Sequence, residues 1–390
     1  MGGRKTFVTN TVLTAADVQD YLMDQSVMVF SNSTTRGSAI PTPTQGMVAY
    51  LTGTDSLEAY NGTAWTSAAG ISSGNAIING AFDIWQRGTS VSVTSSGLAY
   101  SADRFYLYNN GNGSMTASQQ TFTPGAAPAA GYEGRFFHRI SIPSLGTTTG
   151  WIMQQRIEDV RTFAGQTLTF SFWAKSSNTQ TLSAGWEQNF GSGGSSTVTG
   201  TFVASISLTS SWTRYSYTVT LPSISGKTIG TNPYLIVSFA HGSNAKTGDL
   251  DIWGVQLEAG SVANPFRRNA NSIQGELAAC QRYYQRINYK AESVYPNFSF
   301  GSASSTTLAV QAIKLTEMRA VPSSIDYLGL ILEDFVNIYA PTAVTINGTR
   351  SSSSILVFDV TVSSGLTPFR PYGTRGNNSS THFLGINAEL

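Results

Sequence analysis

The sequence predicts a mainly β protein in which an antiparallel β-sandwich, of jelly-roll type, is flanked by two smaller units. Between residue 76 and about residue 265, nine strand candidates follow one another with no helix signal between them. Several of them alternate with a period of two: in the segment 167–174, Leu168, Phe170 and Phe172 share one face. Ser and Thr make up about a quarter of the 390 residues, and only 12% are charged, against roughly 25% in an average protein. Hydroxyl side chains on the outer faces of strands account for that low charge, and Thr in particular favours strands.

The first 70 residues predict a small unit made of one short helix and a β-meander. Thr14 suits the N-cap position and Asp17 the first turn of a helix over residues 15–24. Pro41 and Pro43 mark a turn-rich segment before the meander, which ends on Trp65. The expected strands span 27–30, 47–51 and 56–60. Residues 68–75 are small and polar, which is typical of a linker.

The sandwich is predicted to occupy residues 76–268. Gly, Ser, Asn and Pro separate its strands, as expected for turns. The nine strand candidates span 104–108, 135–142, 151–157, 167–174, 183–187, 197–206, 213–221, 234–239 and 250–257.

Residues 270–290 are predicted to form a linking amphipathic helix. Within 272–288, apolar side chains recur at steps of three and four, which is the period of a helix face; they are Ile273, Leu277, Cys280, Tyr284 and Ile287. The remaining residues, 291–390, are predicted to form a C-terminal β-domain. Its strand candidates span 306–313, 324–332, 354–362 and 383–389.

Composition excludes several classes of function. The chain has 23 basic and 22 acidic residues, a net charge of +1 and no basic run, so binding of nucleic acid through phosphate contacts is not expected. No apolar run approaches the roughly 18–20 residues of a transmembrane helix, so membrane insertion is not expected either. A single Cys and three widely separated His residues lack the spacing of a metal or cofactor site, and we expect neither group. Asp249 and Asp251 could join loop carbonyls around Ca²⁺, but they do not form a full ligand set.

Several segments resemble known proteins. VLTAADVQDYLMDQSVMVF and PTQGMVAYLTGTDSLEAYNGTAW, within residues 12–65, look like the N-terminal unit of many bacteriophage tail and other virion proteins. IINGAFDIWQRGTS with YSADRFYLY (77–108), and WGVQLEAGSVANPFRRNANSIQGELAACQRYYQR (253–286), resemble the jelly-roll domain of phage tail-fibre and appendage proteins, as the closing FLGINAEL resembles their C-terminus. TLTFSFWAKS, SWTRYSYTVT and LDIWGVQLEAG stand in the order found in carbohydrate-binding modules of the galactose-binding-like jelly-roll type, a similarity that implies fold more directly than ligand.

The resemblance implies a non-enzymatic structural protein of the virion, a tail fibre or receptor-binding appendage. Such a protein is made in the host cytoplasm, assembles as a homotrimer, binds other virion proteins through its N-terminal unit and contacts host surface polysaccharide through its β-domains. The alternative is a head fibre, a capsid decoration or a collar or neck component whose contacts are with other virion proteins. A polysaccharide depolymerase is a third possibility, although no hydrolase motif is present and we expect no catalytic residue.

A glycan site needs aromatic rings to stack on sugar faces and amide, carboxylate or guanidinium groups to bond hydroxyls. Two clusters offer them. Trp85, Gln86 and Arg87 lie near the start of the sandwich segment, and Trp186 and Gln188, on either side of Glu187, precede the loop GSGGSS at 191–196. A Trp in an alternating strand is more often core than ligand platform, so a structural role is open for both clusters. Trp173 is open among surface, subunit contact and core.

Overall fold

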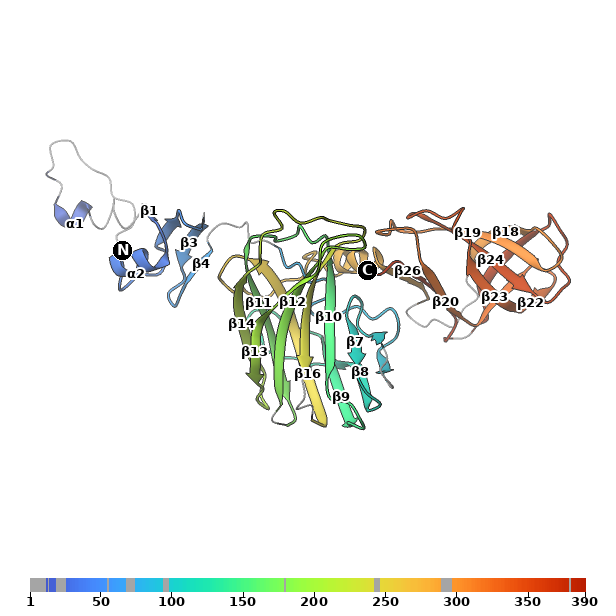
Figure 1. The fold of residues 1–390 in the computed structure, drawn as a ribbon, viewed down its shortest axis with the longest axis horizontal. Helices are drawn as coiled ribbons and strands as arrows, with labels where there is room; N and C mark the ends of the chain where they lie inside the picture. The colour runs from blue at the N-terminus through green and yellow to red at the C-terminus, as the bar shows by residue number, and fades with distance from the viewer. Residues whose placement is uncertain are drawn as a thin grey trace.

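The fold was analysed in a computed structural model, which describes residues 12, 14–18, 26–54, 56–67, 74–93, 98–178, 180–241, 246–288, 297–378 and 380–390. Figure 1 shows three bodies in chain order along the longest axis: a small N-terminal unit, a central sandwich and a C-terminal β-domain. Almost all pairings between neighbouring strands are antiparallel, which confirms the predicted fold class.

The N-terminal unit is a four-stranded sheet with one helix beside it. The sheet order is β1 (Val27–Phe30), β2 (Val48–Leu51), β3 (Ser56–Tyr60) and β4 (Trp65–Ser67). Helix α1 (Ala15–Val18) covers the start of the predicted helix, and the rest of that helix, like most of the predicted linker, lies outside the described residues. The sequence did not predict helix α2 (Ser33–Ala39), which Asn32 caps. Arg36 of α2 is buried, forms an ion pair with Glu58 and lies 4.4 Å from the Trp65 ring, so it ties the helix to the sheet.

Two six-stranded sheets form the sandwich. The first, called here the β10 sheet, has the order β13 (Val198–Ser207), β12 (Thr181–Asn189), β15 (Tyr234–His241), β10 (Trp151–Glu158), β7 (Tyr106–Asn109), β6 (Leu98–Tyr100). The second, the β11 sheet, has the order β14 (Thr213–Thr220), β11 (Thr167–Ser176), β16 (Gly248–Ala259), β9 (Phe136–Ser144), β8 (Ser114–Thr121), β5 (Ser90–Val93). All nine predicted strands are present, and β5, β6 and β8 were not predicted.

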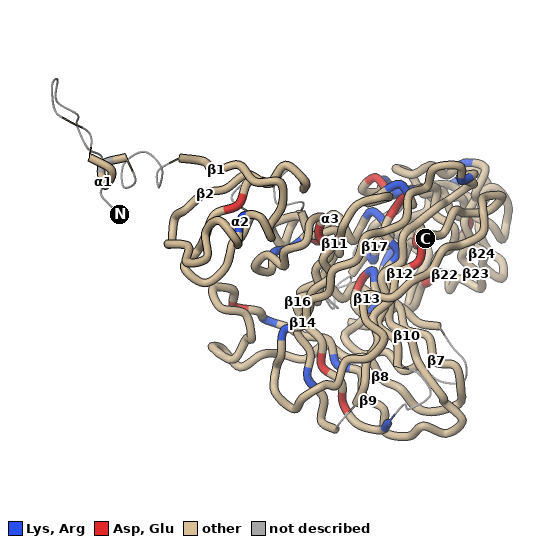
Figure 2. Tube along the Cα trace, turned by 60° about the vertical axis from the view of Figure 1, so that its left-hand side comes forward, with Lys and Arg blue, Asp and Glu red and all other residues tan. Residues whose placement is uncertain are grey.

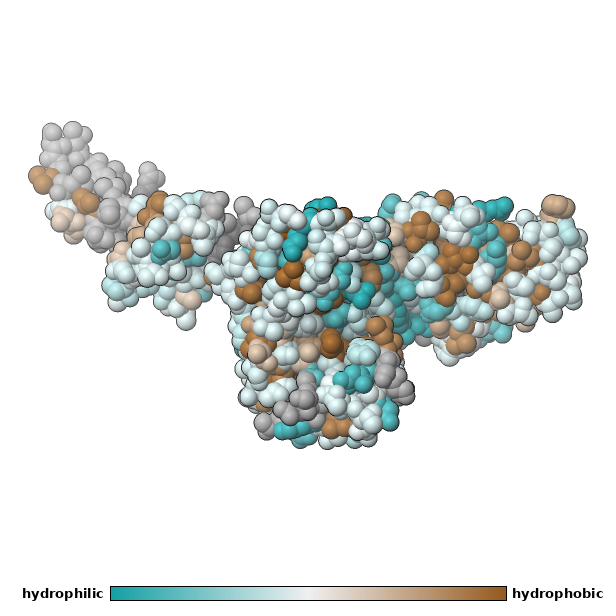
Figure 3. All heavy atoms as spheres, viewed as in Figure 1, coloured by the Kyte–Doolittle hydropathy of each residue, from teal (hydrophilic) through white to brown (hydrophobic). Residues whose placement is uncertain are grey.

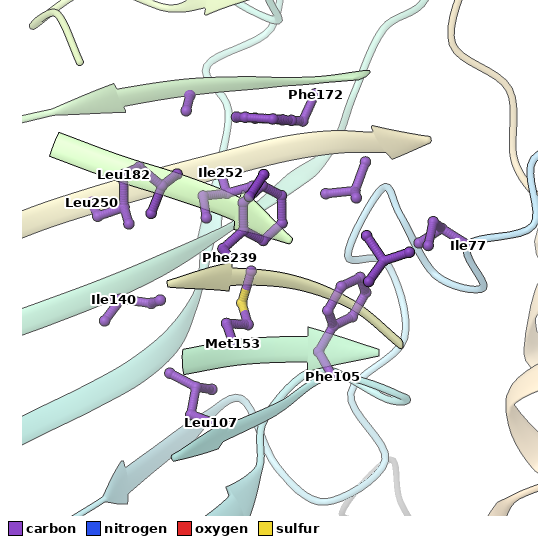
Figure 4. Packing of buried hydrophobic residues seen from close by; sticks show 14 of the residues in the cluster. Ile77, Phe105, Leu107, Ile140, Met153, Phe172, Leu182, Phe239, Leu250 and Ile252 are labelled. Carbon is purple, nitrogen blue, oxygen red and sulfur yellow. The ribbon is translucent and has the colours of Figure 1, made fainter. Parts of the chain in front are cut away.

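The main core lies between these two sheets. Figure 4 shows Met153 and Phe239 of the β10 sheet near Phe172 and Ile252 of the β11 sheet. A second cluster, around Trp253, covers the opposite side of the β11 sheet, and Trp173 belongs to it with 8% of its surface exposed. Because both faces of β11 are covered, Trp173 is a core residue.

The linking helix is shorter than predicted. Helix α3 spans Ile273–Gln281. The chain then forms β17 (Tyr284–Ile287), which pairs with β26 (Phe383–Asn387). The prediction of a helix to residue 288 is therefore wrong. The reason is that the backbone of Tyr284–Ile287 pairs with a strand about 100 residues further along the chain. Local periodicity contains no information about such a distant partner.

The C-terminal β-domain consists of two sheets around a second core. The smaller has the order β17, β26, β20 (Ser324–Leu328). The larger, called here the seven-stranded sheet, has the order β22 (Ile338–Tyr339), β21 (Leu330–Glu333), β25 (Pro371–Gly376), β18 (Asn297–Ala303), β19 (Leu308–Lys314), β24 (Ile355–Val362), β23 (Pro341–Ile346). The strand predicted over 324–332 breaks at Gly329, whose φ is 59°. Leu332, Phe358 and Leu384 are among the buried residues between the sheets. None of the helices in the described ranges is long and apolar enough to cross a membrane.

Candidate functional site

The first predicted glycan-binding cluster, Trp85–Arg87, lies in the interior of the molecule. Trp85 is 6% exposed, stacks on the His138 ring at 5.4 Å and donates from Nε1 to the Phe82 carbonyl. Gln86 is fully buried, and its backbone N–H donates to Asp103 Oδ1 at 2.8 Å. With the Trp85 ring and the Gln86 amide already occupied, these two residues have no surface to offer a sugar, and Arg87 is half-buried.

These residues instead join the sandwich to the C-terminal domain. The Gln86 side chain donates to the Tyr284 carbonyl at 2.8 Å and accepts from the Arg286 N–H at 3.2 Å. Arg87 lies 3.5 Å from the centre of the Tyr284 ring and donates to the Glu389 carboxylate. The sequence reasoning missed this role, because the partners lie about 200 and 300 residues away in the chain.

Three segments singled out in the sequence meet at this junction, which we call the interdomain junction. Glu276 of α3 accepts from the Asn79 N–H, and Asp83 pairs with Arg268 at 2.7 Å. The carboxylate of Glu389, in the FLGINAEL segment, accepts from Arg104. Figure 2 shows basic and acidic residues interspersed around α3, β17 and the C-terminus. The segments are therefore parts of one structural unit in space.

Asp103 and Arg104 lie together in a turn. Arg104 has a φ of 72° and bonds Glu389, whereas Asp103 bonds Gln86. Burial raises the pKa of the Asp103 carboxyl and lowers that of the Arg104 guanidinium. Both groups are held in the interior by their partners, which fits a structural role and leaves neither group facing a substrate.

The second predicted cluster, on β12, also faces the core. Trp186 is 8% exposed and lies directly over Gly200, where an added Cβ would come within 2.3 Å of the indole ring. Gln188 is fully buried and donates to the Pro222 carbonyl at 3.0 Å. Glu187, between them, lies on the opposite, outer face because side chains alternate along a strand. On this strand Glu187, and not Trp186 or Gln188, is on the side that faces outward.

Glu187 belongs to a row of polar and aromatic side chains on the outer face of the β10 sheet. The strand register places Glu187 opposite Ile236, which is opposite Arg156. Two positions along β10, Gln154 is opposite Tyr106. The outward residues of this face, called here the tyrosine face, are Tyr100, Tyr106, Tyr108, Gln154, Arg156, Glu187, Asn189 and Tyr234.

Arg156 is the central charge of the tyrosine face. Its guanidinium lies 4.7 Å from the centre of the Tyr234 ring and 5.2 Å from that of Tyr106, and it donates to the Tyr106 hydroxyl at 3.2 Å. It also donates to the Leu390 carbonyl. Burial raises the pKa of the Tyr106 phenol, and the neighbouring Arg156 opposes that rise. Tyr106, 7% exposed, thus holds Arg156 in place rather than presenting a ring.

The accessible groups of this face surround small side chains. Tyr108 is 37% exposed, while Tyr234, Arg156 and Glu187 are half-buried. Gly185 and Ser238 lie directly opposite one another on neighbouring strands, and both have small side chains. Asn189 donates to Glu187 at 3.1 Å, which fixes the carboxylate beside the tyrosines. Aromatic rings can stack on a ligand, and a guanidinium, a carboxylate and amides can exchange hydrogen bonds with its hydroxyl groups.

The carboxylates considered for calcium are paired with basic side chains. Arg139 donates to both oxygens of Asp251, at 2.7 and 2.8 Å, and lies 3.2 Å from Asp249. Lys175 lies 3.5 Å from Asp251. Within the residues that the structure describes, no group of three or more His, Cys, Asp and Glu side chains is placed to hold a metal ion. These carboxylates act as ion-pair partners on the β11 sheet.

The fold and this face define a multi-unit β protein with a central antiparallel sandwich. No protein-family model matches the chain, and no curated protein does. Among solved structures, the enzymatically active domain of tailspike protein 4 of bacteriophage CBA120 is 15% identical over 47% of this chain and 21% of its own, with a TM-score of 0.30. A CBM4 structure is 17% identical over 47% of this chain and 98% of its own, with a TM-score of 0.27. TmCBM61 in complex with β-1,4-galactotriose is 11% identical over 48% of this chain and 99% of its own, with a TM-score of 0.27. This chain thus spans about a fifth of the tailspike chain and nearly all of the two CBM chains.

Proposed function

We propose that the protein is a non-enzymatic glycan-binding appendage of a phage virion, a tail fibre or receptor-binding protein. The observation that carries the proposal is the tyrosine face, where Tyr108, Tyr234, Arg156 and Glu187 offer ring surfaces and charged hydrogen-bonding groups. The resemblance of residues 12–65 to virion N-terminal units supports attachment to other virion proteins. Host surface polysaccharide is the ligand class that these side chains suit.

A binding role is favoured over hydrolysis because the carboxylates already form ion pairs or hydrogen bonds with other side chains. Hydrolysis of a glycosidic bond requires two carboxyl groups about 5–10 Å apart on either side of that bond. Of the acids on the outward side of the β10 sheet, Glu158 forms an ion pair with Arg282 at 2.9 Å, and Asn189 bonds Glu187. Asp83 pairs with Arg268 in the interdomain junction. We therefore propose binding without turnover.

A glycan array probed with the purified full chain tests the binding claim directly. We expect retention of one or more polysaccharides, and Tyr234→Ala and Glu187→Gln should each weaken binding about tenfold, which corresponds to about 1.4 kcal/mol. Tyr60→Ala is the matched control, since Tyr60 is a half-buried tyrosine in the N-terminal unit. Equal loss in the control, or undiminished binding in both face variants, would remove the tyrosine face from the proposal.

The virion role has its own test. Particles that lack the protein should fail to adsorb to host cells, and normal adsorption contradicts a receptor-binding function. A density map that places the protein on the capsid lattice or neck would favour a head fibre, capsid decoration or collar component. Release of oligosaccharide from host polysaccharide would instead indicate a depolymerase.

A further inference from the structure

The outer face of the seven-stranded sheet is an exposed, mainly apolar surface. Its residues come later in the sequence than those of the tyrosine face. One row of residues runs across six of its strands in direct register. That row consists of Ile338, Glu333, Gly373, Phe300, Ala312 and Val357. Phe300, near its centre, is 57% exposed, and its ring lies against Gly373, where an added Cβ would come within 3.1 Å. We call this surface the Phe300 face.

Apolar exposure is concentrated in this domain. The described residues include 15 exposed large hydrophobic side chains, and eight of them lie between Phe300 and Phe369. Figure 3 shows brown, apolar atoms gathered on the C-terminal body at the right. Three shallow depressions of about 320, 410 and 270 Å³ follow the face, lined in turn by Phe300 and Phe369, by Phe335 and Ile338, and by Ile355. Contiguous apolar surface of this kind marks interaction sites in soluble proteins.

Two turns project phenylalanine rings from the edges of the face. Phe335 is 74% exposed and Phe369 89%, and each has a φ of 67°. A bulky residue with positive φ is a strained conformation that requires support from its surroundings. Here Asp334 accepts from the N–H groups of Val336 and Asn337, and it lies 3.3 Å from Arg370, so the two turns are tied together. The two turns that carry the exposed rings are thus linked to each other.

Of the charged side chains on the face, two are paired with each other, two lie toward its margin, and Asp359 lies opposite Val310 within it. Glu333 and Arg375 form an ion pair with each other, and both are nearly buried. Lys314 ends β19, and Arg350 borders the first depression. An apolar, aromatic centre with a polar rim is the composition of protein–protein interfaces, from whose centre charged residues are depleted.

We propose that the Phe300 face binds another copy of this chain. The seven strands hold 40 residues, which at about 4.8 Å spacing and about 3.3 Å rise give a footprint of roughly 600 Å². The projecting Phe335 and Phe369 rings add to it, which brings the area close to the roughly 800 Å² that each partner contributes to a stable interface. Copies of one chain present identical apolar faces, and closed symmetric assemblies form in this way. The proposal does not depend on glycan binding.

Sedimentation velocity and light scattering of the full chain test the proposal. We expect a mass of at least twice 41.6 kDa at about 10–100 µM, a concentration range of the order at which modest interfaces assemble. Phe300→Ser combined with Phe369→Ser should return the mass to that of one chain or raise the dissociation constant at least tenfold. Leu98→Ser is the matched control, because Leu98 is also 57% exposed but lies on β6 of the sandwich.

A second variant guards against misfolding. Ala312→Glu places a charge at an exposed position of the central row without removing a core contact, and it should dissociate the assembly with an unchanged circular-dichroism spectrum. A wild-type chain that is monomeric at 100 µM overturns the proposal, as does an assembly that both variants leave intact. Loss of glycan binding in these variants from a monomeric wild type would assign the face to a glycan and also overturn it.

Discussion

His138 provides a quantitative test of how tightly the sandwich end of the interdomain junction is packed. Its imidazole is fully buried, with Phe82 at 5.1 Å and the Trp85 ring stacked at 5.4 Å. Its Nε2 lies 2.9 Å from the Ser101 hydroxyl, while Nδ1 has no hydrogen-bond partner among the described residues. A protonated imidazole would carry a second N–H with no acceptor, in an apolar site. Burial accordingly lowers the pKa of His138 from 6.5 to about 3.

The sign of the effect on stability follows from that difference. In the unfolded chain His138 takes up a proton below about pH 6.5, whereas in the folded protein it stays neutral down to about pH 3. Protonation therefore favours the unfolded state, and stability falls as the pH falls through this window. Between pH 7 and pH 5 the expected loss of unfolding free energy is about 2 kcal/mol, approaching the limiting slope of about 1.4 kcal/mol for each pH unit.

Denaturant unfolding followed by tryptophan fluorescence at pH 7 and pH 5 measures this loss. Six of the seven Trp residues lie in the sandwich segment, and Trp85 touches the imidazole directly. The comparison is between wild type and His138→Gln. Other groups titrate in both proteins, including Asp103 and Glu276, whose carboxyl pKa values burial raises. They act in the opposite direction, because the folded state then holds the extra proton, and their effect cancels in the difference.

The substitution also alters packing, but it does so equally at both pH values. The informative quantity is therefore the change in unfolding free energy between pH 7 and pH 5 in each protein. We expect wild type to lose about 2 kcal/mol more than His138→Gln between pH 7 and pH 5. A difference below about 0.5 kcal/mol, within the usual error of denaturant extrapolation, would refute the reasoning. An NMR titration in which the His138 ring protonates near pH 6 would do the same.

Two further substitutions probe the junction and the sandwich core. Glu389→Ala removes the buried partner of Arg104 and should cost about 3–5 kcal/mol of unfolding free energy, because a buried guanidinium is left uncompensated; loss below about 1 kcal/mol in urea titration contradicts a buried ion pair. Gly200→Ala should lower the unfolding free energy by about 1–3 kcal/mol, because the new methyl group meets the Trp186 ring. Gly348→Ala, with no atom within 4 Å of the added Cβ, is its control and should change stability little.

The strands of the sandwich were predictable because their signal is local. In β11 the alternation of Leu168 and Phe170 with Thr169 reports directly on which face is buried. The tyrosine face left the same kind of signal, since in β10 the apolar Trp151 and Met153 alternate with Ile152, Gln154 and Arg156. That pattern, combined with Tyr106 and Tyr108 of β7, could have indicated an outer face with ligand-binding chemistry.

The remaining features depend on partners distant in the chain. Tyr284 continues a helical spacing that begins at Ile273, yet it lies in a strand because Asn387 is its partner. Trp85 and Gln86 look like ligand-binding residues when only their neighbours in the sequence are considered. Their hydrogen bonds and ring contacts reach Asp103, His138 and Tyr284, and a local pattern contains no information about such contacts.

There is a physical reason why three of the segments that resemble other proteins lie at the interdomain junction. A junction that must bury Asp103, Arg104, Glu276 and Glu389 allows few side chains at each position, because every buried charge requires a partner with the right geometry. An outer strand face tolerates many side chains, so the outward positions of the tyrosine face contain no recognisable motif. In this chain these recognisable segments therefore lie where the sandwich meets the C-terminal domain, whereas outward positions of alternating strands carry no comparable signal.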